Sequence, residues 1–171
     1  QYAHTHGVVH RDIKPENILV GPFGEVLLLD WGLAKVRSEE GAPSDIDDMS
    51  SESLTEDPTM TGFQKLQGTI AYMSPEQIKK APDIDGRTDI YSLGVVLYEA
   101  LTGVKPSLGD TMDKIKASTL NDIPIIPSEI STTPISQVLD DIVMQCLAKD
   151  ANKRMQSVGE LIRVLKEGLG V

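Results

Sequence analysis

The sequence predicts a mainly helical domain with one short β-hairpin near its start. Two apolar runs flank a turn-like stretch at residues 21–25, and long apolar or amphipathic segments occupy residues 87–103, 133–150 and 157–171. The chain has 171 residues, of which 40% are hydrophobic and 25% are charged. This length and composition are typical of one globular domain with a sizeable core.

The predicted hairpin joins the strands ILV and VLLL through the turn-like sequence GPFGE at residues 21–25. We expect Ile18 to pair with Leu29, which places Asn17 opposite Asp30 at the open end. Directly opposed residues of a hairpin have Cβ atoms roughly 5 Å apart. An amide oxygen and a carboxylate in one small space suit Mg²⁺, which takes one or two protein oxygens and completes its shell with water and phosphate.

Further polar residues lie just before the hairpin. Asp12 lies five residues before Asn17 in a segment too irregular to form a strand, and Lys14 lies between them. A carboxylate can orient and deprotonate a hydroxyl, and a nearby lysine can neutralise charge on a transferring phosphoryl group. Singly, Asp12 and Asn17 are also residues that cap turns. Together with the metal ligands they indicate phosphoryl transfer, in which positioning and electrostatics supply most of the catalysis.

The second half of the chain, residues 77–171, is predicted to form a helical body. Its most apolar helix is expected over residues 87–103, with Thr88 as the N-cap and Gly103 as the C-terminal stop. Apolar side chains lie around most of the circumference of this helix, so we expect it to be buried at the centre of the domain.

Two amphipathic helices follow. The first is predicted to begin after a Thr133 cap, and the second begins at Ser157 with Glu160 completing a capping box. The single cysteine lies on the apolar stripe and is expected in the core rather than as a nucleophile. The residues expected to face the core are Ile135, Val138, Leu139, Ile142, Val143, Cys146 and Leu147 in the first helix, and Val158, Leu161, Ile162 and Leu165 in the second.

Residues 38–61 form an acidic stretch rich in Ser and Thr and almost without large apolar residues. Such a stretch cannot offset its chain entropy by burial, so we expect a mobile insert, either a solvated linker or a regulated segment. The net charge of −10 argues against nonspecific nucleic-acid binding. It points to basic substrate segments, unless the charge of the insert serves regulation.

Other features bear on location and metal binding. One cysteine and no apolar run of membrane-spanning length favour a reducing, cytoplasmic location without membrane contact from this segment. The closely spaced His4, His6 and His10 have no further zinc ligands nearby at a suitable spacing. We therefore expect no zinc site, and we place His4 and His6 at the exposed end of a helix.

Four short motifs occur in order along the chain: HRDIKPEN at residues 10–17, DWG at 30–32, GTIAYMSPE at 68–76 and DIYSLG at 89–94. They resemble the catalytic loop, the Asp-Phe-Gly motif, the Ala-Pro-Glu motif and the central-helix motif of eukaryotic-type (Hanks-type) serine/threonine protein kinases, with a likeness to bacterial members. The resemblance covers essentially the whole chain, and it implies the C-terminal lobe of the catalytic domain with an activation segment at residues 30–76.

The resemblance also implies roles for the polar residues. Asp12 is the expected catalytic base, Lys14 the contact to the γ-phosphate, and Asn17 and Asp30 the ligands of Mg²⁺. Lys14 with the proline after it, and Thr69 in the substrate-side loop, resemble serine/threonine kinases rather than tyrosine kinases. The implied cofactors are ATP and Mg²⁺, and the implied substrates are protein hydroxyls.

Structural roles follow from the same resemblance. His10 is expected to pack behind Trp31, which replaces the usual Phe, and Arg154 is expected to pair with Glu76. The residues with implied structural roles are His10, Trp31, Gly32, Glu76, Asp89 and Arg154.

Arg11, beside the expected base, implies control by a phosphate on the activation segment that pairs with its guanidinium. Thr61 is the preferred acceptor because it lies close to Gly68 and Thr69 in the sequence. The carboxylates of the insert are an alternative partner for Arg11. The other candidate acceptors are Thr59, Ser50, Ser51 and Ser53.

The sequence has no glycine-rich phosphate loop and no strand lysine with its helix glutamate, which in this family form an N-terminal lobe over ATP. We therefore expect a fragment of a longer kinase, with little activity alone, that partners the N-terminal lobe of the same polypeptide. A non-catalytic scaffold is the main alternative, and a small-molecule kinase of similar fold is a remoter one.

Overall fold

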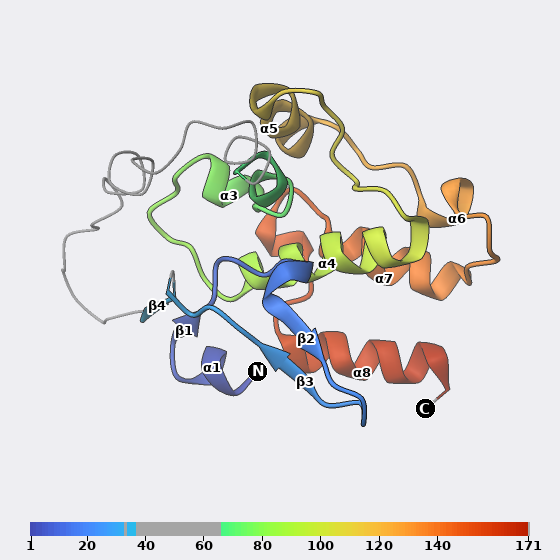
Figure 1. Cartoon of the computed structure of the whole chain (residues 1–171), viewed down its shortest axis with the longest axis horizontal. Helices are drawn as coiled ribbons and strands as arrows, with labels where there is room; N and C mark the ends of the chain where they lie inside the picture. The colour runs from blue at the N-terminus through green and yellow to red at the C-terminus, as the bar shows by residue number, and fades with distance from the viewer. Residues whose placement is uncertain (33, 37–65, 171) are drawn as a thin grey trace.

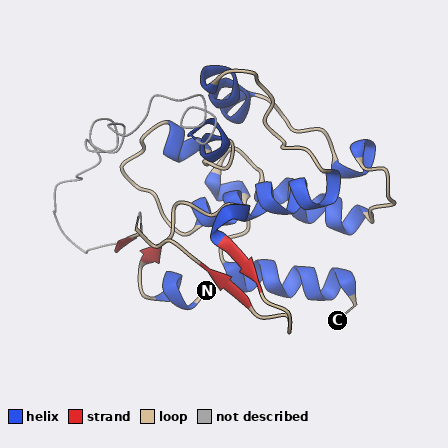
Figure 2. Cartoon of the chain, in the orientation of Figure 1, coloured by secondary structure: helices blue, strands red, loops and turns tan. Residues whose placement is uncertain are grey.

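The computed structural model describes residues 1–32, 34–36 and 66–170 of the chain (Figure 1). In these ranges helices predominate, and the strands form two small antiparallel sheets (Figure 2). The predicted mainly helical fold with a short hairpin is therefore confirmed. None of the helices within the described ranges is long and apolar enough to cross a membrane.

Both sheets lie in the N-terminal part of the chain. β2 (Ile18–Val20) pairs with β3 (Val26–Leu28) in the predicted hairpin. β1 (Val8–Val9) pairs with β4 (Lys35–Val36), and these strands of two residues each are too short to leave a periodic pattern in the sequence. The second pairing brings together the two ends of the segment that carries most of the predicted site.

The predicted register of the hairpin is wrong by one residue, because Ile18 lies opposite Leu28 rather than Leu29. The turn sets this register. The Gly21 N–H donates to the Glu25 carbonyl at 2.8 Å and closes a five-residue loop. The residues that flank this loop therefore form the first pair of the ladder.

α4 (Arg87–Thr102) is the central helix, and most side chains of its first two turns are buried. Gly103 ends it in the left-handed conformation, with φ 74°, as predicted. The expected N-cap is wrong, because Gly86 and not Thr88 occupies that position. The Thr88 hydroxyl instead points into the core and donates to Glu76 at 2.7 Å.

α7 (Gln137–Cys146) and α8 (Val158–Leu169) complete the helical body, and α7 packs against both α4 and α8. α7 begins three residues later than predicted, because the Ser136 hydroxyl and not that of Thr133 caps its first turn. α8 begins as predicted, with the hydroxyl of Ser157 as its cap.

The core lies between α4, α7 and α8. Cys146 is buried there, as predicted, and its burial raises the pKa of the thiol to about 12. Two expected core positions are wrong, since Val138 is 43% exposed and Ile162 is 44% exposed. Val138 lies against Gly168 of α8, which has no side chain to cover it. The buried residues of the two main clusters are Tyr72, Tyr91, Val95, Tyr98, Val143 and Leu147, and Ile90, Ile142, Cys146, Met155 and Leu161.

Short helices connect these units. Residues 66–70 are helical, and the helix after them is capped by a reciprocal pair of bonds between Ser74 and Gln77. α3 (Pro75–Ile78) packs against α5 (Met112–Asn121), and α6 (Pro127–Ile130) packs against both α4 and α7. The remaining elements are α1 (Tyr2–Thr5), η1 (Pro15–Asn17) and η2 (Ala151–Lys153).

We predict that Gly94→Ala destabilises the protein. Gly94 lies on α4 where it meets α7, and a Cβ added there would lie 2.6 Å from the Cβ of Cys146. Because protein interiors are close-packed, the two helices would have to move apart, at a cost of about 1–3 kcal/mol in the free energy of unfolding. Urea unfolding measures this cost.

Gly159→Ala is the matched control, because it also adds a methyl group to a glycine within a helix. The nearest neighbour of that methyl group is the end of the flexible Gln1 side chain, which can move. We expect no loss of stability, and a gain below about 1 kcal/mol from helix propensity. Equal losses in the two variants would contradict the close contact between α4 and α7.

Candidate active site

Asp89, in the first turn of α4, holds the chain before the predicted base in place. Its side chain is buried and accepts the backbone N–H groups of His10 and Arg11, both at 2.9 Å. The Nε2 atom of His4 lies 2.7 Å from the same carboxylate. Three donors from the N-terminal part of the chain therefore converge on one buried side chain of the central helix.

Arg11 adopts the left-handed backbone conformation, with φ 70°. This conformation costs a residue with a side chain roughly 1–2 kcal/mol. Both backbone groups of Arg11 are held, the N–H by Asp89 and the carbonyl by the side-chain amide of Gln77 at 2.7 Å. A strained turn persists where its surroundings determine it in this way, and Asp12 follows the turn directly.

His10 is buried behind Asp12 and links it to the hairpin. Its Nε2 lies 2.9 Å from the carbonyl of Leu29, and its Nδ1 accepts the N–H of Asp12 at 3.3 Å. These two contacts assign a ring with its proton on Nε2. The ring meets that of Trp31 edge-on, with centroids 4.7 Å apart. The structure thus brings together His10 and Trp31.

Asp12, Lys14 and Asn17 form a compact polar cluster. Lys14 Nζ lies 2.8 Å from Asp12 Oδ2. Asn17 Nδ2 donates to the same oxygen at 3.0 Å and to the Asp12 carbonyl at 2.8 Å, because the short helix η1 turns Asn17 back toward it. Within the described ranges, Asp12 Oδ1 accepts no hydrogen bond, so this oxygen is the one open to an incoming donor.

Thr69 adjoins this cluster from a distant part of the sequence. Lys14 Nζ donates to the Thr69 hydroxyl at 3.1 Å, across 55 residues of the chain. The ammonium group therefore lies between the expected base and the expected substrate-side loop.

Asn17 and Asp30 both lie at the open end of the hairpin, but they do not face each other as predicted. The Leu29 N–H donates to the Asn17 carbonyl at 2.8 Å, so Asn17 faces Leu29 and Asp30 follows it. Asp30 is exposed, has a positive φ of 58°, and accepts the N–H of Gly32 at 3.3 Å. The described residues contain no group of three or more acidic, His or Cys side chains that could hold a metal.

The Arg11 guanidinium is incompletely paired. Its Nε is buried and has no hydrogen-bond partner in the part of the chain that the structure describes. Burial lowers the pKa of Arg11, and the charge of Asp89 opposes that shift. A buried donor without an acceptor favours the arrival of an anion. Thr59 and Thr61, the phosphate acceptors predicted for this role, lie outside the described residues.

Glu76 and Arg154 form an ion pair between residues 78 positions apart. Two parallel bonds join them, Nη1 to Oε1 at 2.6 Å and Nη2 to Oε2 at 2.7 Å. Burial acts to raise the pKa of Glu76, but the hydrogen bonds and charge of Arg154 outweigh it and hold that pKa below its ordinary value. The other three N–H groups of Arg154 donate to the carbonyls of Arg87, Ala148 and Lys149.

Three residues that support the site were missed or misplaced by sequence reasoning. His4 was expected at an exposed helix end, which is wrong, because it bonds to Asp89. Thr88 was expected as a cap and instead bonds to Glu76. Gln77 had one usable signal, its position three residues after a serine, which is typical of a capping box.

The protein kinase domain model matches residues 1–163 of this chain. Since this match covers most of the chain, the chain belongs to the protein kinase domain family. It is similar to bacterial proteins named serine/threonine-protein kinases.

Three of these bacterial relatives show how similar the sequences are and how much of each protein the similarity covers. PknD of Protochlamydia amoebophila is 40% identical over 171 residues, covering 98% of this chain and 17% of the relative. PknD of Chlamydia caviae is 41% identical over 163 residues, covering 94% and 17%. PknB of Mycolicibacterium smegmatis is 33% identical over 160 residues, covering 94% and 23%. The chain thus spans less than a quarter of the length of each of these relatives.

We predict that Glu76→Gln lowers the free energy of unfolding by about 3–5 kcal/mol at neutral pH, because it leaves the buried charge of Arg154 without its counter-ion. The pH dependence changes as well. Since the folded pKa of Glu76 is lowered, the wild type keeps this stabilisation above the ordinary value of about 4.3 and loses it as the pH falls through the lower folded pKa. The variant lacks that part of the acid sensitivity, which urea unfolding across this pH range measures.

Glu167→Gln is the control, because it removes the same charge from the exposed pair with Arg163. We expect a loss of at most about 0.5 kcal/mol. Similar losses in the two variants would show that the Glu76 pair contributes no more than a surface ion pair.

Proposed function

We propose that this chain is the C-terminal lobe of a protein kinase domain, and that its protein transfers the γ-phosphoryl group of Mg·ATP to serine or threonine hydroxyls of proteins. The main support is the Asp12 carboxylate, held between the Lys14 ammonium at 2.8 Å and the Asn17 amide at 3.0 Å. A base, a cation and a metal ligand in one cluster are the groups that phosphoryl transfer needs. A non-catalytic scaffold would have no use for this arrangement.

In this mechanism Asp12 orients the substrate hydroxyl and accepts its proton. Lys14 and Asn17 occupy Oδ2, so the proton goes to Oδ1. The Lys14 ammonium, of which only 14% of the side chain is exposed, places positive charge where negative charge develops on the transferring group. Because Lys14 also bonds to Thr69 at 3.1 Å, that charge is held next to the substrate-side loop.

We propose that Asn17 and Asp30 hold a magnesium ion. The Asn17 side chain donates through Nδ2 to Asp12, so its Oδ1 is the oxygen that it can offer to a cation. With the Asp30 carboxylate, this gives one neutral and one anionic hard ligand and leaves most of an octahedron to water and phosphate. When bound, Mg²⁺ supplies charge neutralisation to the phosphates of ATP.

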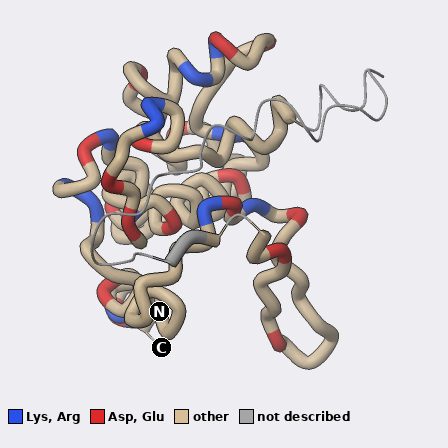
Figure 3. Tube along the Cα trace, turned by 90° about the vertical axis from the view of Figure 1, so that its left-hand side faces the viewer, with Lys and Arg blue, Asp and Glu red and all other residues tan. Residues whose placement is uncertain are grey.

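We propose that the apolar faces of the hairpin contact the nucleotide and the N-terminal lobe of the same polypeptide. Leu19 and Leu27 pair directly, so they share one face, and each is about half exposed. Phe23 at the tip is 94% exposed. Between residues 18 and 29 the only charged residue is Glu25, and the hairpin projects from the helical body (Figure 3). Apolar surface of this kind marks a binding face.

We also propose that Arg11 pairs with a phosphate on residues 30–76, with Thr61 as the preferred acceptor and Thr59 as the next. The buried Nε of Arg11, which has no hydrogen-bond partner among the described residues, supports this role. We expect mass spectrometry of the full polypeptide after incubation with Mg·ATP to find phosphate on Thr61. If the Arg11 guanidinium acts through that phosphate, Arg11→Ala should lower the activity no further than Thr61→Ala does. Phosphate found only at other positions would exclude Thr61.

We predict that Asp12→Asn, in the full polypeptide, lowers kcat for phosphorylation of a protein substrate by about 10²–10⁴-fold. The amide keeps the size of the side chain but cannot accept a proton. Transfer of labelled phosphate from ATP measures the effect. Asp113→Asn is the control, since the Asp113 side chain is 96% exposed, and it should keep full activity. An Asp12→Asn variant within tenfold of wild type would exclude Asp12 as the base.

A further inference from the structure

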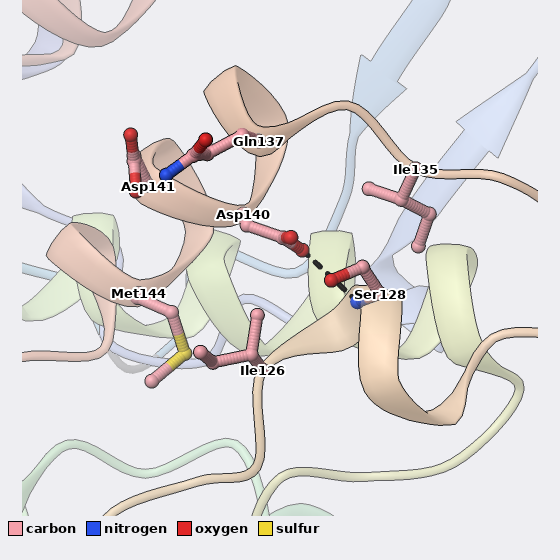
Figure 4. Close-up of a pocket in the computed structure, with 7 residues that line it drawn as sticks. All are labelled: Ile126, Ser128, Ile135, Gln137, Asp140, Asp141 and Met144. Carbon is pink, nitrogen blue, oxygen red and sulfur yellow. Dashed lines mark hydrogen bonds between the residues drawn. The ribbon is translucent and has the colours of Figure 1, made fainter.

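A hollow of about 490 Å³ lies between α6, α7 and the chain that leads into α6 (Figure 4). Ile126, Ile135 and Met144 line it with apolar side chains, and Asp140 and Asp141 bring carboxylates to it. We call this hollow the α6–α7 groove. In Figure 1, α6 and α7 lie on the side of the molecule away from β1 and β4. None of the residues that line the groove belongs to the candidate active site.

Hydrogen bonds hold the walls of the groove in place. Asp140 is buried and accepts the N–H of Ser128 at 3.0 Å, which ties α6 to α7 (Figure 4). Tyr98 of α4 donates to the carbonyl of Ile125 at 2.9 Å, which fixes the chain before α6. A preformed groove of this kind binds without the entropic cost of ordering its walls.

Apolar surface continues outward from the groove. Ile123, Ile125 and Ile126 are 85%, 50% and 40% exposed, although the hydrogen bond from Tyr98 holds the backbone at Ile125. Contiguous apolar side chains that stay exposed on an ordered segment mark an interaction surface.

The charge of this surface has one sign. Residues 117–148 contain four acidic residues and no Lys, Arg or His. Asp140 is used within the fold, but Asp141 is exposed and its carboxylate has no hydrogen bond or ion pair with any other described residue. The next basic residue, Lys149, has its Nζ 6.0 Å from the centroid of the Tyr91 ring, and that Nζ is buried. The Asp141 carboxylate is therefore available to a cation from outside.

We propose that the α6–α7 groove docks a protein segment in which an apolar side chain is flanked by Lys or Arg. The apolar side chain packs against Ile126 and Met144, and a cationic side chain pairs with Asp141. Docking here leaves the cluster around Asp12 free, so a bound protein can present a hydroxyl elsewhere. The binding itself does not depend on the proposed kinase activity.

Charge selects this occupant over others. Nucleic acids and anionic membranes would bring further negative charge to a groove that is lined by two carboxylates and by no Lys, Arg or His. A second copy of the same face would oppose like charges, which costs free energy at an interface. An apolar segment without a cation would leave Asp141 desolvated and unpaired.

The test is the fluorescence anisotropy of a short labelled peptide, with one leucine between two arginines, titrated with the full polypeptide. We expect saturable binding that weakens at least about tenfold in Asp141→Lys and in Met144→Lys, which place a cation in the groove. Asp113→Lys makes the same change of net charge as Asp141→Lys, at a side chain of α5 that is 96% exposed, and should bind like wild type. Peptides with glutamate for arginine, or serine for leucine, should not bind.

Two further measurements keep docking separate from catalysis and from folding. Asp12→Asn should bind the peptide as wild type does, even though phosphorylation is lost. The Met144 methyl resonance of the unmodified protein should shift when the peptide is added, which requires no variant. Lack of saturable binding, equal weakening in Asp141→Lys and Asp113→Lys, an unmoved Met144 resonance, or preference for the glutamate peptide, for DNA or for anionic vesicles would overturn the proposal.

Discussion

The buried carboxylate of Asp89 is the interaction on which the rest of the site depends. A buried charge is costly unless it is fully hydrogen-bonded, and Asp89 meets that need with donors from His4, His10 and Arg11. Its place in the first turn of α4 adds the favourable field of the helix N-terminus. The two residues depend on each other. The Arg11 N–H stabilises the buried carboxylate of Asp89, and that carboxylate holds the left-handed turn at Arg11 in place. Because Asp12 follows this turn directly, the turn determines its position.

Thr88, the residue before Asp89, ties the segment that carries Glu76 to the same turn of α4. Thr88 donates to Glu76, which is bound to Arg154, while Asp89 holds the chain before Asp12. Gln77, next to Glu76, donates to the carbonyl of Arg11 and so links the Glu76 segment directly to the turn before Asp12. One turn of the most buried helix therefore positions two segments that are far apart in the sequence. Since a packed core allows little movement, the relative position of those segments is set before any ligand arrives.

The polar residues of the site and the hairpin could be predicted from the sequence, because residue types at fixed spacing and apolar runs around a turn are local signals. The register of the hairpin could not be predicted, because it depends on a hydrogen bond within the turn. The start of α7 was missed because Thr133 and Ser136 are both good caps, and only tertiary packing selects one. The contact of His4 with Asp89 joins residues 85 positions apart, and no local pattern reports it.

The exposed apolar surfaces of the chain differ in charge, and this difference separates their roles. The hairpin carries one charged residue over residues 18–29, so its faces suit flat or apolar partners such as a nucleobase or another part of the same domain. The α6–α7 groove has apolar walls of similar character, but its carboxylates make an uncharged partner unfavourable there. Each surface is therefore satisfied only by a partner whose charge matches its own surroundings.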